Sequence, residues 1–472
     1  MSHIKMKPFQ LWFMVLMIVA FCSGMNQGQA AGWQAGQGKA KITPPEYMPM
    51  AGYASRGPKH ATGKLTDLWA KALVLQDAHG KQAVLVTLDL VGIDGGLTSE
   101  ISAELKREFH WDRSQIAFCT SHTHSGPVIK RTLMPMHYIV FDEENQQLTE
   151  RYEAFLKKNI LQAVRDAVSR LQPATLEWNS GRTDFAVNRR ENREPEVPQL
   201  RAEGKLRGPN DHDVPVLLVK YQGTLGAIVF GYACHNTVLG GMEWCGDYAG
   251  YAQIDLEKQF PGCQAMFWAG CGADQNPLPR KTVELAQEYG RRLASAVAAV
   301  VKGPLKPITP QLSTRFNTVR IPLAPAPGKE ELEKTIHSGN RYEVTRAKLL
   351  LDQLAQGKEL VSDYQYPIEV WKLGNDVTFV ILSGEVVVDY ALRLKEELSP
   401  EKDATQIWCA GYANDVMAYI PSRRVLREGG YEGGGAMVYY GLPAPWAPEI
   451  EELIVGQVKE MATAHDPAAS QQ

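Results

Sequence analysis

The spacing of apolar residues alternates along this chain between strand-like and helix-like patterns. The pattern predicts helices over residues 97–109, 148–171, 282–301 and 330–354, of which 148–171 is the clearest. Short apolar runs bounded by turn-forming residues predict strands at 33–45, 65–76, 82–91, 115–119, 175–188, 214–221, 226–233, 376–382 and 405–410. Strands that alternate with helices predict an α/β or mixed α+β fold, in which sheets are flanked by helices.

Several stretches interrupt this pattern. Residues 191–208 are charged and contain two prolines, so we predict a surface loop there. Residues 302–310 and 322–328 are rich in proline, with strand-like residues between them, and we interpret the region 302–328 as a surface crossover within one domain. The two strands at 214–221 and 226–233 are expected to form a hairpin around Gly223. We find no internal sequence repeat.

The N-terminal residues have the organisation of a secretory signal peptide. Lys5 and Lys7 are followed by an apolar run at 11–22 and then by small residues around Ala30. The apolar run is short for a transmembrane helix. We therefore expect residues 1–30 to be removed and the mature protein to be extracytoplasmic, either periplasmic or secreted. Cys22 leaves lipidation as a minority alternative, because the bulky Phe21 before it fits a lipobox poorly.

Composition and charge exclude several classes of protein. The chain has 472 residues, of which 44% are hydrophobic and 22% charged, as in ordinary globular proteins. The formal net charge is -3 and no block of basic residues stands out, so nothing indicates a nucleic-acid partner.

Six cysteines remain after the predicted signal peptide: Cys119, Cys234, Cys245, Cys263, Cys271 and Cys409. An exported chain can form disulfides, and pairing Cys234 with Cys245, or Cys263 with Cys271, would close short loops. Buried free thiols are the equally weighted alternative.

A histidine pair follows one of the predicted strands. The segment C-T-S-H-T-H-S-G-P, residues 119–127, places His122 and His124 two residues apart. Residues i and i+2 of an extended chain share a face, so both imidazoles can point into one site. Imidazole is the commonest metal ligand in proteins. The motif alone supports a metal site and a pair of surface histidines about equally.

Three later stretches carry further candidate residues. His235 leaves the end of an apolar strand and enters a glycine-rich loop, as His122 does. Glu385 follows Ser383-Gly384 at a strand end, where a carboxylate in the first turn of a helix is also favourable. Tyr419 and Tyr431 lie in the segment that follows. Taken singly, each residue also fits a structural role.

Taken together, these stretches resemble the neutral, non-lysosomal ceramidase family. Residues 121–127 match its T-H-T-H-S-G-P motif. The loop at His235 and Thr237, followed by D-x-x-G-Y-A at 247–252, matches its second histidine motif. Glu385 follows a glycine, as the family's glutamate does, and Asn414, Asp415 and Tyr419 precede Tyr431-Glu432-Gly433 in the family's order.

The resemblance implies one zinc ion (Zn²⁺) held by His122, His235, Glu385 and Tyr419. Histidine and carboxylate ligands with an open position for water are typical of catalytic zinc. Bound zinc lowers the pKa of water and polarises a carbonyl oxygen. The implied activity is that of an exported zinc-dependent amidohydrolase, acting with zinc-activated water on an N-acyl amide such as an N-acylsphingosine.

The same resemblance implies roles for three other residues. His124 would act beside the metal as an acid/base or oxyanion partner, Arg189 would contact the substrate, and Tyr431 would bind the carbonyl or the leaving group. The implied partner is a small-molecule or lipid amide. A lipid substrate would imply peripheral contact with a membrane.

Two departures from the family pattern change this expectation. The family's G-D-V-S-P-N loop contains a serine assigned to the active site, whereas residues 272–277 read G-A-D-Q-N-P without a serine. We therefore expect attack by water rather than a covalent acyl-enzyme. The chain also ends soon after Tyr419, so we expect a single large catalytic domain over residues 32–472, of mixed sheets and flanking helices, without the family's C-terminal β-sandwich.

Other classes of hydrolase use similar histidine motifs. A metallo-β-lactamase would continue as H-x-H-x-D-H, but Ser125, Gly126 and Pro127 follow His124. A TIM-barrel amidohydrolase would leave the Glu385 and Tyr419 stretches unexplained, and neither H-E-x-x-H nor G-x-S-x-G occurs. The alternatives are a hydrolase of another amide or ester on the same fold, and an exported binding protein without catalysis.

Overall fold

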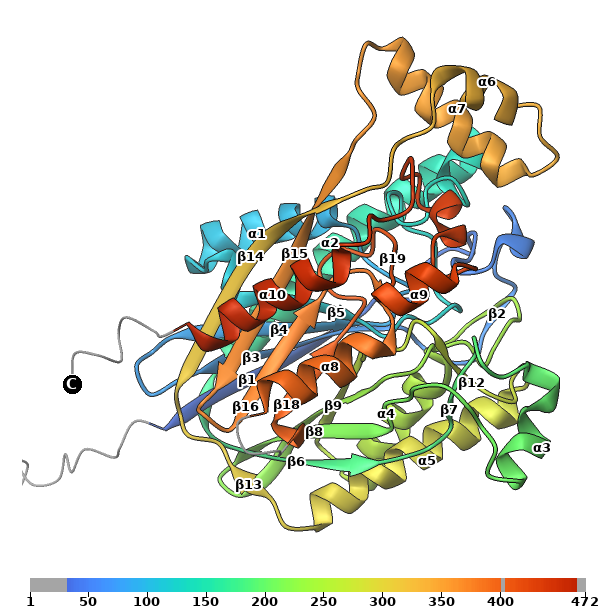
Figure 1. Ribbon diagram of the computed structural model, residues 1–472. Coiled ribbons are helices and arrows are strands. Elements are labelled where there is room, and N and C mark those ends of the chain that lie inside the picture. Colours follow the sequence, from blue (N-terminus) through green and yellow to red (C-terminus); the bar gives the residue numbers. More distant parts are fainter. Residues whose placement is uncertain (1–31, 400–403, 465–472) are drawn as a thin grey trace, which may run out of the picture.

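Two β-sheets and the helices that cover them make up the fold (Figure 1). The computed structural model describes residues 32–399 and 404–464. The larger sheet contains nine strands: β1 (Trp33–Lys41), β3 (Trp69–Gln76), β4 (Gln82–Leu88), β5 (Ile116–Thr120), β6 (Gln172–Arg182), β8 (Asp213–Tyr221), β9 (Thr224–Tyr232), β11 (Gln264–Ala269) and β13 (Lys306–Pro307). They are ordered β11-β9-β8-β6-β1-β3-β4-β5, with β13 beside β6.

The smaller sheet has the order β14-β15-β16-β18. Its strands are β14 (Leu312–Pro322), β15 (Asp363–Leu373), β16 (Val377–Leu382) and β18 (Ile407–Ala410). Short strands form three more pairs: β2 (Gly63–Lys64) with β10 (Glu243–Trp244), β7 (Ala186–Asn188) with β12 (Gln275–Pro277), and β17 (Glu385–Val386) with β19 (Tyr419–Ile420).

The helices complete a mixed α/β fold, which confirms the predicted fold class. They are α1 (Gly95–Phe109), α2 (Glu143–Ser169), α3 (Val197–Ala202), α4 (Asp247–Gln259), α5 (Val283–Lys302), α6 (Lys329–Thr335), α7 (Arg341–Ala355), α8 (Val388–Leu398), α9 (Arg423–Glu428) and α10 (Ile450–Thr463). The pair α6 and α7 projects from the body of the molecule (Figure 1).

The two sheets pack face to face around a shared apolar core. Trp178 and Trp268 of the larger sheet lie in the same buried cluster as Trp371, Phe379 and Trp408 of the smaller sheet. Because this cluster removes large aromatic side chains from water, it contributes strongly to the free energy that holds the two sheets together.

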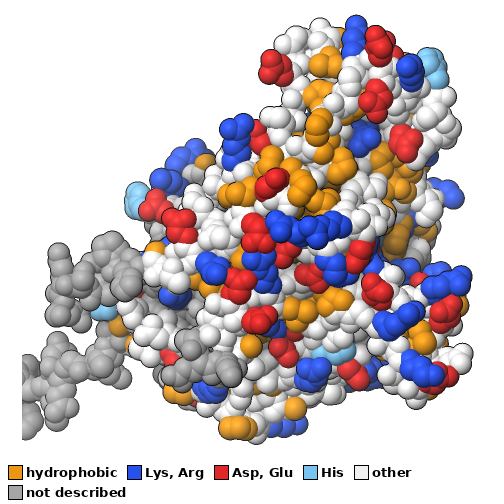
Figure 2. Space-filling view, viewed as in Figure 1, with side chains coloured by type: hydrophobic (Ala, Val, Ile, Leu, Met, Phe, Trp, Pro, Cys, Tyr) orange, Lys and Arg blue, Asp and Glu red, His pale blue; other side chains and the backbone are white. Residues whose placement is uncertain are grey.

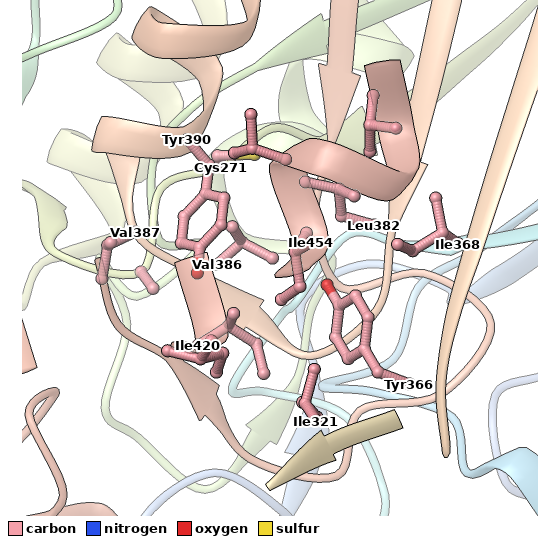
Figure 3. Close-up of a cluster of buried hydrophobic side chains, with 14 of the residues drawn as sticks. Cys271, Ile321, Tyr366, Ile368, Leu382, Val386, Val387, Tyr390, Ile420 and Ile454 are labelled. Carbon is pink, nitrogen blue, oxygen red and sulfur yellow. The ribbon is translucent and has the colours of Figure 1, made fainter. Parts of the chain in front are cut away.

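Helices cover the outer faces of both sheets. The helices α1 and α2 pack on β3, β4 and β5, whereas α4 and α5 pack on β8, β9 and β11. The helices α8 and α10 pack on the smaller sheet, and Figure 3 shows part of that core, where Tyr390 of α8, Ile454 of α10 and Tyr366 of β15 gather. The molecule is therefore built as helices, sheet, sheet and helices.

The order of elements repeats three times, although the sequence shows no repeat. The three units are β1-β3-β4-α1-β5-α2, β6-β8-β9-α4-β11-α5 and β14-β15-β16-α8-β18-α10. In each unit three strands pair antiparallel in sequence order, and the fourth strand pairs parallel to the third. Each parallel pair, β4–β5, β9–β11 or β16–β18, needs a crossover, which a helix provides. The two strands of each pair therefore end at the same edge.

Two glycines allow α2 to approach β1 closely. A Cβ atom at Gly38 would lie 2.1 Å from the backbone oxygen of Ala163, and one at Gly36 would lie 2.1 Å from that of Ala167. No side chain fits at these distances. The glycines of the first strand are therefore explained by contact between the helix and the strand.

Two predictions about helices were wrong in detail. Residues 191–208 contain the short helix α3, which has proline in its first turn, a position where the missing N–H costs nothing. The helix predicted at 330–354 is divided into α6 and α7. The break occurs because Asn340 caps α7, its side chain accepting hydrogen bonds from the backbone N–H groups of Tyr342 and Glu343.

The hairpin of β8 and β9 around Gly223 is confirmed. All six cysteines within the described residues are buried and free, so neither suggested short-loop disulfide is present. No helix in residues 32–399 or 404–464 is long and apolar enough to cross a membrane. Figure 2 shows acidic and basic side chains interspersed over one face. The predicted signal peptide lies outside the described residues and stays a prediction.

Substituting Gly38→Ala is expected to lower the free energy of unfolding by about 1–3 kcal/mol, because the new methyl group would force β1 and α2 apart. Chemical denaturation measures this. The control is Gly456→Ala in α10, where a Cβ meets nothing within 4 Å, and where alanine should stabilise the helix by up to about 1 kcal/mol. Equal stability of the two variants would contradict the close approach.

Candidate metal centre

Three histidines converge at the edge where the parallel strand pairs end. One ring nitrogen from each of His122, His124 and His235 lies within 4.8 Å of the other two. His122 follows β5 and His235 follows β9, so the first two units of the fold each contribute to the cluster. The third unit contributes Glu385, which follows β16.

Glu385 lies between two of the rings. Its Oε2 atom is 3.3 Å from Nε2 of His122 and 3.3 Å from Nε2 of His235. This oxygen is buried and has no hydrogen-bond partner among the described residues. The hydroxyl of Tyr419 is 3.2 Å from Nε2 of His235. The structure thus brings together the four residues expected to hold zinc.

The tautomers of two rings follow from their other nitrogen atoms. Nδ1 of His122 contacts the carbonyl oxygen of Val91, and Nδ1 of His235 lies 2.9 Å from that of Gly272. A carbonyl oxygen only accepts hydrogen bonds, so each Nδ1 carries a proton, and Nε2 is the ring atom that each imidazole turns toward the site. Metal-ligating histidines usually have such an outer hydrogen bond.

This arrangement fits a cation. Nε2 of His122 and Nε2 of His235 each lie 3.3 Å from the same carboxylate oxygen, and three such donor atoms turned toward one point favour a positive charge among them. Imidazole and carboxylate ligands suit zinc. The buried, unpartnered Oε2 of Glu385 is the observation that makes the fit specific.

Burial and neighbouring groups set the protonation of the cluster. Burial lowers the pKa of His235 to about 4, with Arg189 acting in the same direction. Burial and His122 hold the pKa of His124 well below its usual value. Burial alone would raise the pKa of Glu385, but the adjacent His122 and His235 hold it well below the ordinary value. At neutral pH the cluster therefore contains neutral His124 and His235 and a carboxylate.

His124 differs from the other two histidines. Its Nε2 is 3.1 Å from that of His122, but its buried Nδ1 has no hydrogen-bond partner among the described residues. The ring packs at 4.7 Å from that of Tyr53, and a Cβ atom at Gly52 would lie 2.5 Å from the imidazole. His124 is therefore held by packing and lacks the outer carbonyl bond of a metal ligand.

Arg189 and Tyr431 lie on the wall beside the cluster. Arg189 donates hydrogen bonds to the hydroxyl of Tyr419 (3.2 Å), to Glu432 (2.7 Å) and to Oδ1 of Asn276 (3.2 Å). The ring of Tyr431 lies 5.2 Å from that of Tyr419, and its side chain is 47% exposed. Together with His124 and His235, these residues border a cleft of about 770 Å³.

His122 and His124 converge for a different reason from the one predicted. His122 lies two residues beyond the end of β5 and has a φ of 58°, so a left-handed turn, rather than an extended strand, directs it into the site. Left-handed backbone is uncommon outside glycine and concentrates at functional sites. Tyr412 (φ 53°) and Asn414 (φ 59°) also adopt the left-handed backbone conformation.

Glu385 is not in the first turn of a helix. It lies in β17, which pairs with the strand of Tyr419, and α8 begins only at Val388. The helix dipole therefore does not explain this carboxylate, whereas pairing of β17 with β19 explains why Glu385 and Tyr419 lie together.

Parts of the motifs have structural roles. Asn414 Oδ1 accepts a hydrogen bond from the N–H of Phe118 (3.0 Å), which ties the tyrosine loop to β5. Asp247 accepts hydrogen bonds from the N–H groups of Val238 (3.3 Å) and Leu239 (2.8 Å), which fixes the loop of His235. These residues position the site without facing it.

Gln275 stands at the position where the family resemblance implies a serine. It is fully buried in β12, and its amide donates a hydrogen bond to the carbonyl oxygen of Ala233. The side chain is thus part of the framework behind His235.

Several residues around the cluster were not predicted from the sequence. The hydroxyl of Tyr440 donates to Oε1 of Glu385, and the ring of Tyr412 stacks on His122 at 4.1 Å. Arg56 donates to the carbonyl oxygens of His124 and of Ala51. A tyrosine among apolar residues gives no sequence signal that separates a role in the site from packing.

The fold and this cluster define a mixed α/β protein with a candidate metal centre of the histidine–carboxylate type. Residues 33–307 match the family described as "Neutral/alkaline non-lysosomal ceramidase, N-terminal", and the chain belongs to this family. The matched range contains His122, His124, Arg189 and His235 and ends before Glu385 and Tyr419.

Individual relatives agree with the family match. The neutral ceramidase of Drosophila melanogaster is 24% identical over 373 residues, which are 75% of this chain and 49% of the relative. This chain thus spans about half the length of that protein. A structure described as "Ceramidase complexed with C2" has a TM-score of 0.71 at 20% identity, covering 92% of this chain and 75% of its own.

A second structure, of the neutral ceramidase from Pseudomonas aeruginosa, has a TM-score of 0.70 at 20% identity. It covers 92% of this chain and 74% of its own. At this level of identity the two structures establish the fold.

Proposed function

We propose that this protein is a zinc-dependent hydrolase of N-acyl amides. The observation that carries the proposal is the convergence of Nε2 of His122 and Nε2 of His235 on the buried, unpartnered Oε2 of Glu385. Membership of the neutral ceramidase family supports the amide as the bond that is cleaved. We also propose that the protein acts outside the cytoplasm, for which the signal-like sequence of residues 1–30 is the support.

His122, His235, Glu385 and Tyr419 would hold the zinc. When bound, zinc supplies a water of lowered pKa and a Lewis acid for a carbonyl oxygen. The carbonyl groups of Val91 and Gly272 orient the two imidazoles, and Tyr440 orients the carboxylate.

His124 would move the proton. Neutral at pH 7, it can accept a proton from the attacking water and pass it to the departing amine nitrogen. Arg189 and the hydroxyl of Tyr431 would bind and orient the substrate carbonyl, because both lie beside Tyr419 on the cleft wall.

The residues present favour attack by water over a side-chain nucleophile. Gln275 stands where relatives carry serine, and its amide is engaged with Ala233. Burial raises the pKa of the thiol of Cys245 to about 12 and that of Cys234 well above its usual value, so neither supplies a thiolate at neutral pH.

Replacing His122 or His235 by alanine is expected to remove zinc and activity together. Loss of a group that only orients a ligand typically costs about 10- to 100-fold in metal affinity, so loss of a ligand costs at least that. Elemental analysis of the purified protein measures the stoichiometry, with His79→Ala in an exposed turn as the control. Full zinc occupancy in both variants would refute the ligand assignment.

Replacing His124 by alanine is expected to reduce turnover of an amide by about 10²- to 10⁴-fold while zinc remains bound, because the proton carrier is lost and the ligands are not. Parallel measurement of turnover and of zinc content tests this. Normal turnover, loss of zinc from this variant, or an acyl adduct trapped on a serine or cysteine would overturn the mechanism.

Substituting Tyr440→Phe is expected to weaken zinc binding by about 10- to 100-fold, because the phenol that fixes Oε1 of Glu385 is removed. Competition with a chromophoric chelator measures the affinity without an activity assay. Tyr439→Phe is the matched control, since the ring of Tyr439 packs on those of Tyr342 and Tyr431, whereas the hydrogen bond to Glu385 comes from Tyr440. Equal affinities in the two variants would show that Tyr440 does not orient the ligand.

A further inference from the structure

The cleft above the candidate metal centre is lined mainly by charged and hydrogen-bonding side chains. Of twenty lining residues, eight are charged and only Leu278 is aliphatic. The volume of about 770 Å³ suits a small molecule. Pockets for small ligands are usually lined mostly by apolar side chains, so this composition is unusual.

The aliphatic residues near the cleft expose almost no surface. Leu278 is 1% exposed. An adjoining cavity of about 400 Å³, which shares Tyr53, Thr237 and Arg280 with the cleft, adds Val238 and Leu239, but these are 0% and 5% exposed. The aliphatic residues that line these cavities therefore offer little surface to a long hydrocarbon chain.

The charges of the cleft are already balanced. Arg280 forms a two-pronged ion pair with Glu194, and Arg189 and Arg190 both bind Glu432 at 2.7 Å. Each of the other charged lining residues also has an oppositely charged partner within 4.0 Å. Covering such pairs with a hydrocarbon chain would remove their hydration without a compensating gain. Because the charges are internally neutralised, the wall favours neither anionic nor cationic ligands.

One polar group in the cleft is free to recognise a ligand. Thr237 lines both cavities and is 2% exposed, and its hydroxyl has no hydrogen-bond partner among the described residues. A buried hydroxyl without a partner is costly, and a hydrogen bond from a substrate would relieve that cost. Thr237 follows the candidate ligand His235 by two residues and lines the same cleft, so we assign a group next to the scissile amide as its partner.

We propose that this site hydrolyses small, water-soluble amides that carry a short acyl group and a neutral, hydroxyl-bearing amine portion, in preference to long-chain N-acylsphingosines. The inference rests on the proposed amide hydrolysis and specifies its substrate. Tyr53 and Tyr431 offer flat surfaces to such a molecule, while Thr237 and the paired charges offer hydrogen bonds.

The test is a homologous series measured with the zinc-loaded full chain. The substrates are N-acyl derivatives of 2-amino-1,3-propanediol, from acetyl to octanoyl, N-acetylated amino sugars, and N-acylsphingosine in detergent. We expect kcat/KM to change less than twofold for each added methylene and to be at least 100-fold lower for N-acylsphingosine. A rise of about fourfold per methylene, as for transfer into an apolar trench, would overturn the inference but leave amide hydrolysis standing. Absence of turnover for every amide would instead overturn the proposed function.

Two variants test the wall directly. The double variant Glu194→Leu with Arg280→Leu removes one ion pair and adds apolar surface, and we expect its octanoyl-to-acetyl ratio of kcat/KM to rise at least tenfold. The matched control, Glu108→Leu with Arg165→Leu, removes a similar two-pronged pair outside the cleft and should leave the ratio unchanged. An unchanged ratio in both proteins would show that the charged wall does not determine chain-length preference.

Thr237→Val tests whether the hydroxyl of Thr237 recognises the hydroxyl group of the substrate. The substitution nearly preserves shape, and we expect it to lower kcat/KM about 5- to 10-fold for the hydroxyl-bearing amides and not for the corresponding deoxy amines, with zinc content unchanged. An equal loss for both kinds of substrate would show that Thr237 does not read the hydroxyl group.

Discussion

The backbone of residues 410–414 holds the ends of all three parallel strand pairs in one place. The carbonyl oxygen of Ala269, at the end of β11, accepts from the N–H of Gly411, that of Leu382 accepts from Ala413, and that of Phe118 accepts from Asn414. Two residues of this segment adopt left-handed backbone, at a cost of roughly 1–2 kcal/mol each. Hydrogen bonds that each contribute about 0.5–1.5 kcal/mol offset this cost. Because this segment joins the three units, it brings the histidines and the carboxylate together.

Different parts of the structure were visible in the sequence to different degrees. Strands such as β8 and β9 were predictable because apolar runs flank a glycine turn, and His122, His235 and Glu385 could be singled out because each follows a strand end. Tyr440 and Tyr412 could not, because contacts between residues far apart in the chain give them their roles. The threefold repetition of the fold was not visible in the sequence, because many different sequences can form the same pattern of strand pairing. The left-handed turn at His122 was hidden because a non-glycine residue rarely adopts it.

The candidate metal centre and the cleft are built by different parts of the chain. Residues at the ends of buried strands form the cluster, and these strands are fixed by the core between the two sheets. The charged wall comes instead from the connections at 189–194 and 428–432, which lie at the surface and carry few core contacts. Connections can change without disturbing the core. A family can therefore keep one chemistry while the molecules that reach it differ.

The distribution of the candidate ligands over three units has a consequence for maturation of the protein. His122 belongs to the first unit, His235 to the second, and Glu385 and Tyr419 to the third. A cation meets at most one or two of these groups on any partly folded chain, and metal binding is coupled to folding wherever the site is not preformed. Under the proposed ligand assignment, the full set of ligands forms only after the third unit has packed against the other two. A chain that ended before β16 would contain His122 and His235 but would lack Glu385 and Tyr419.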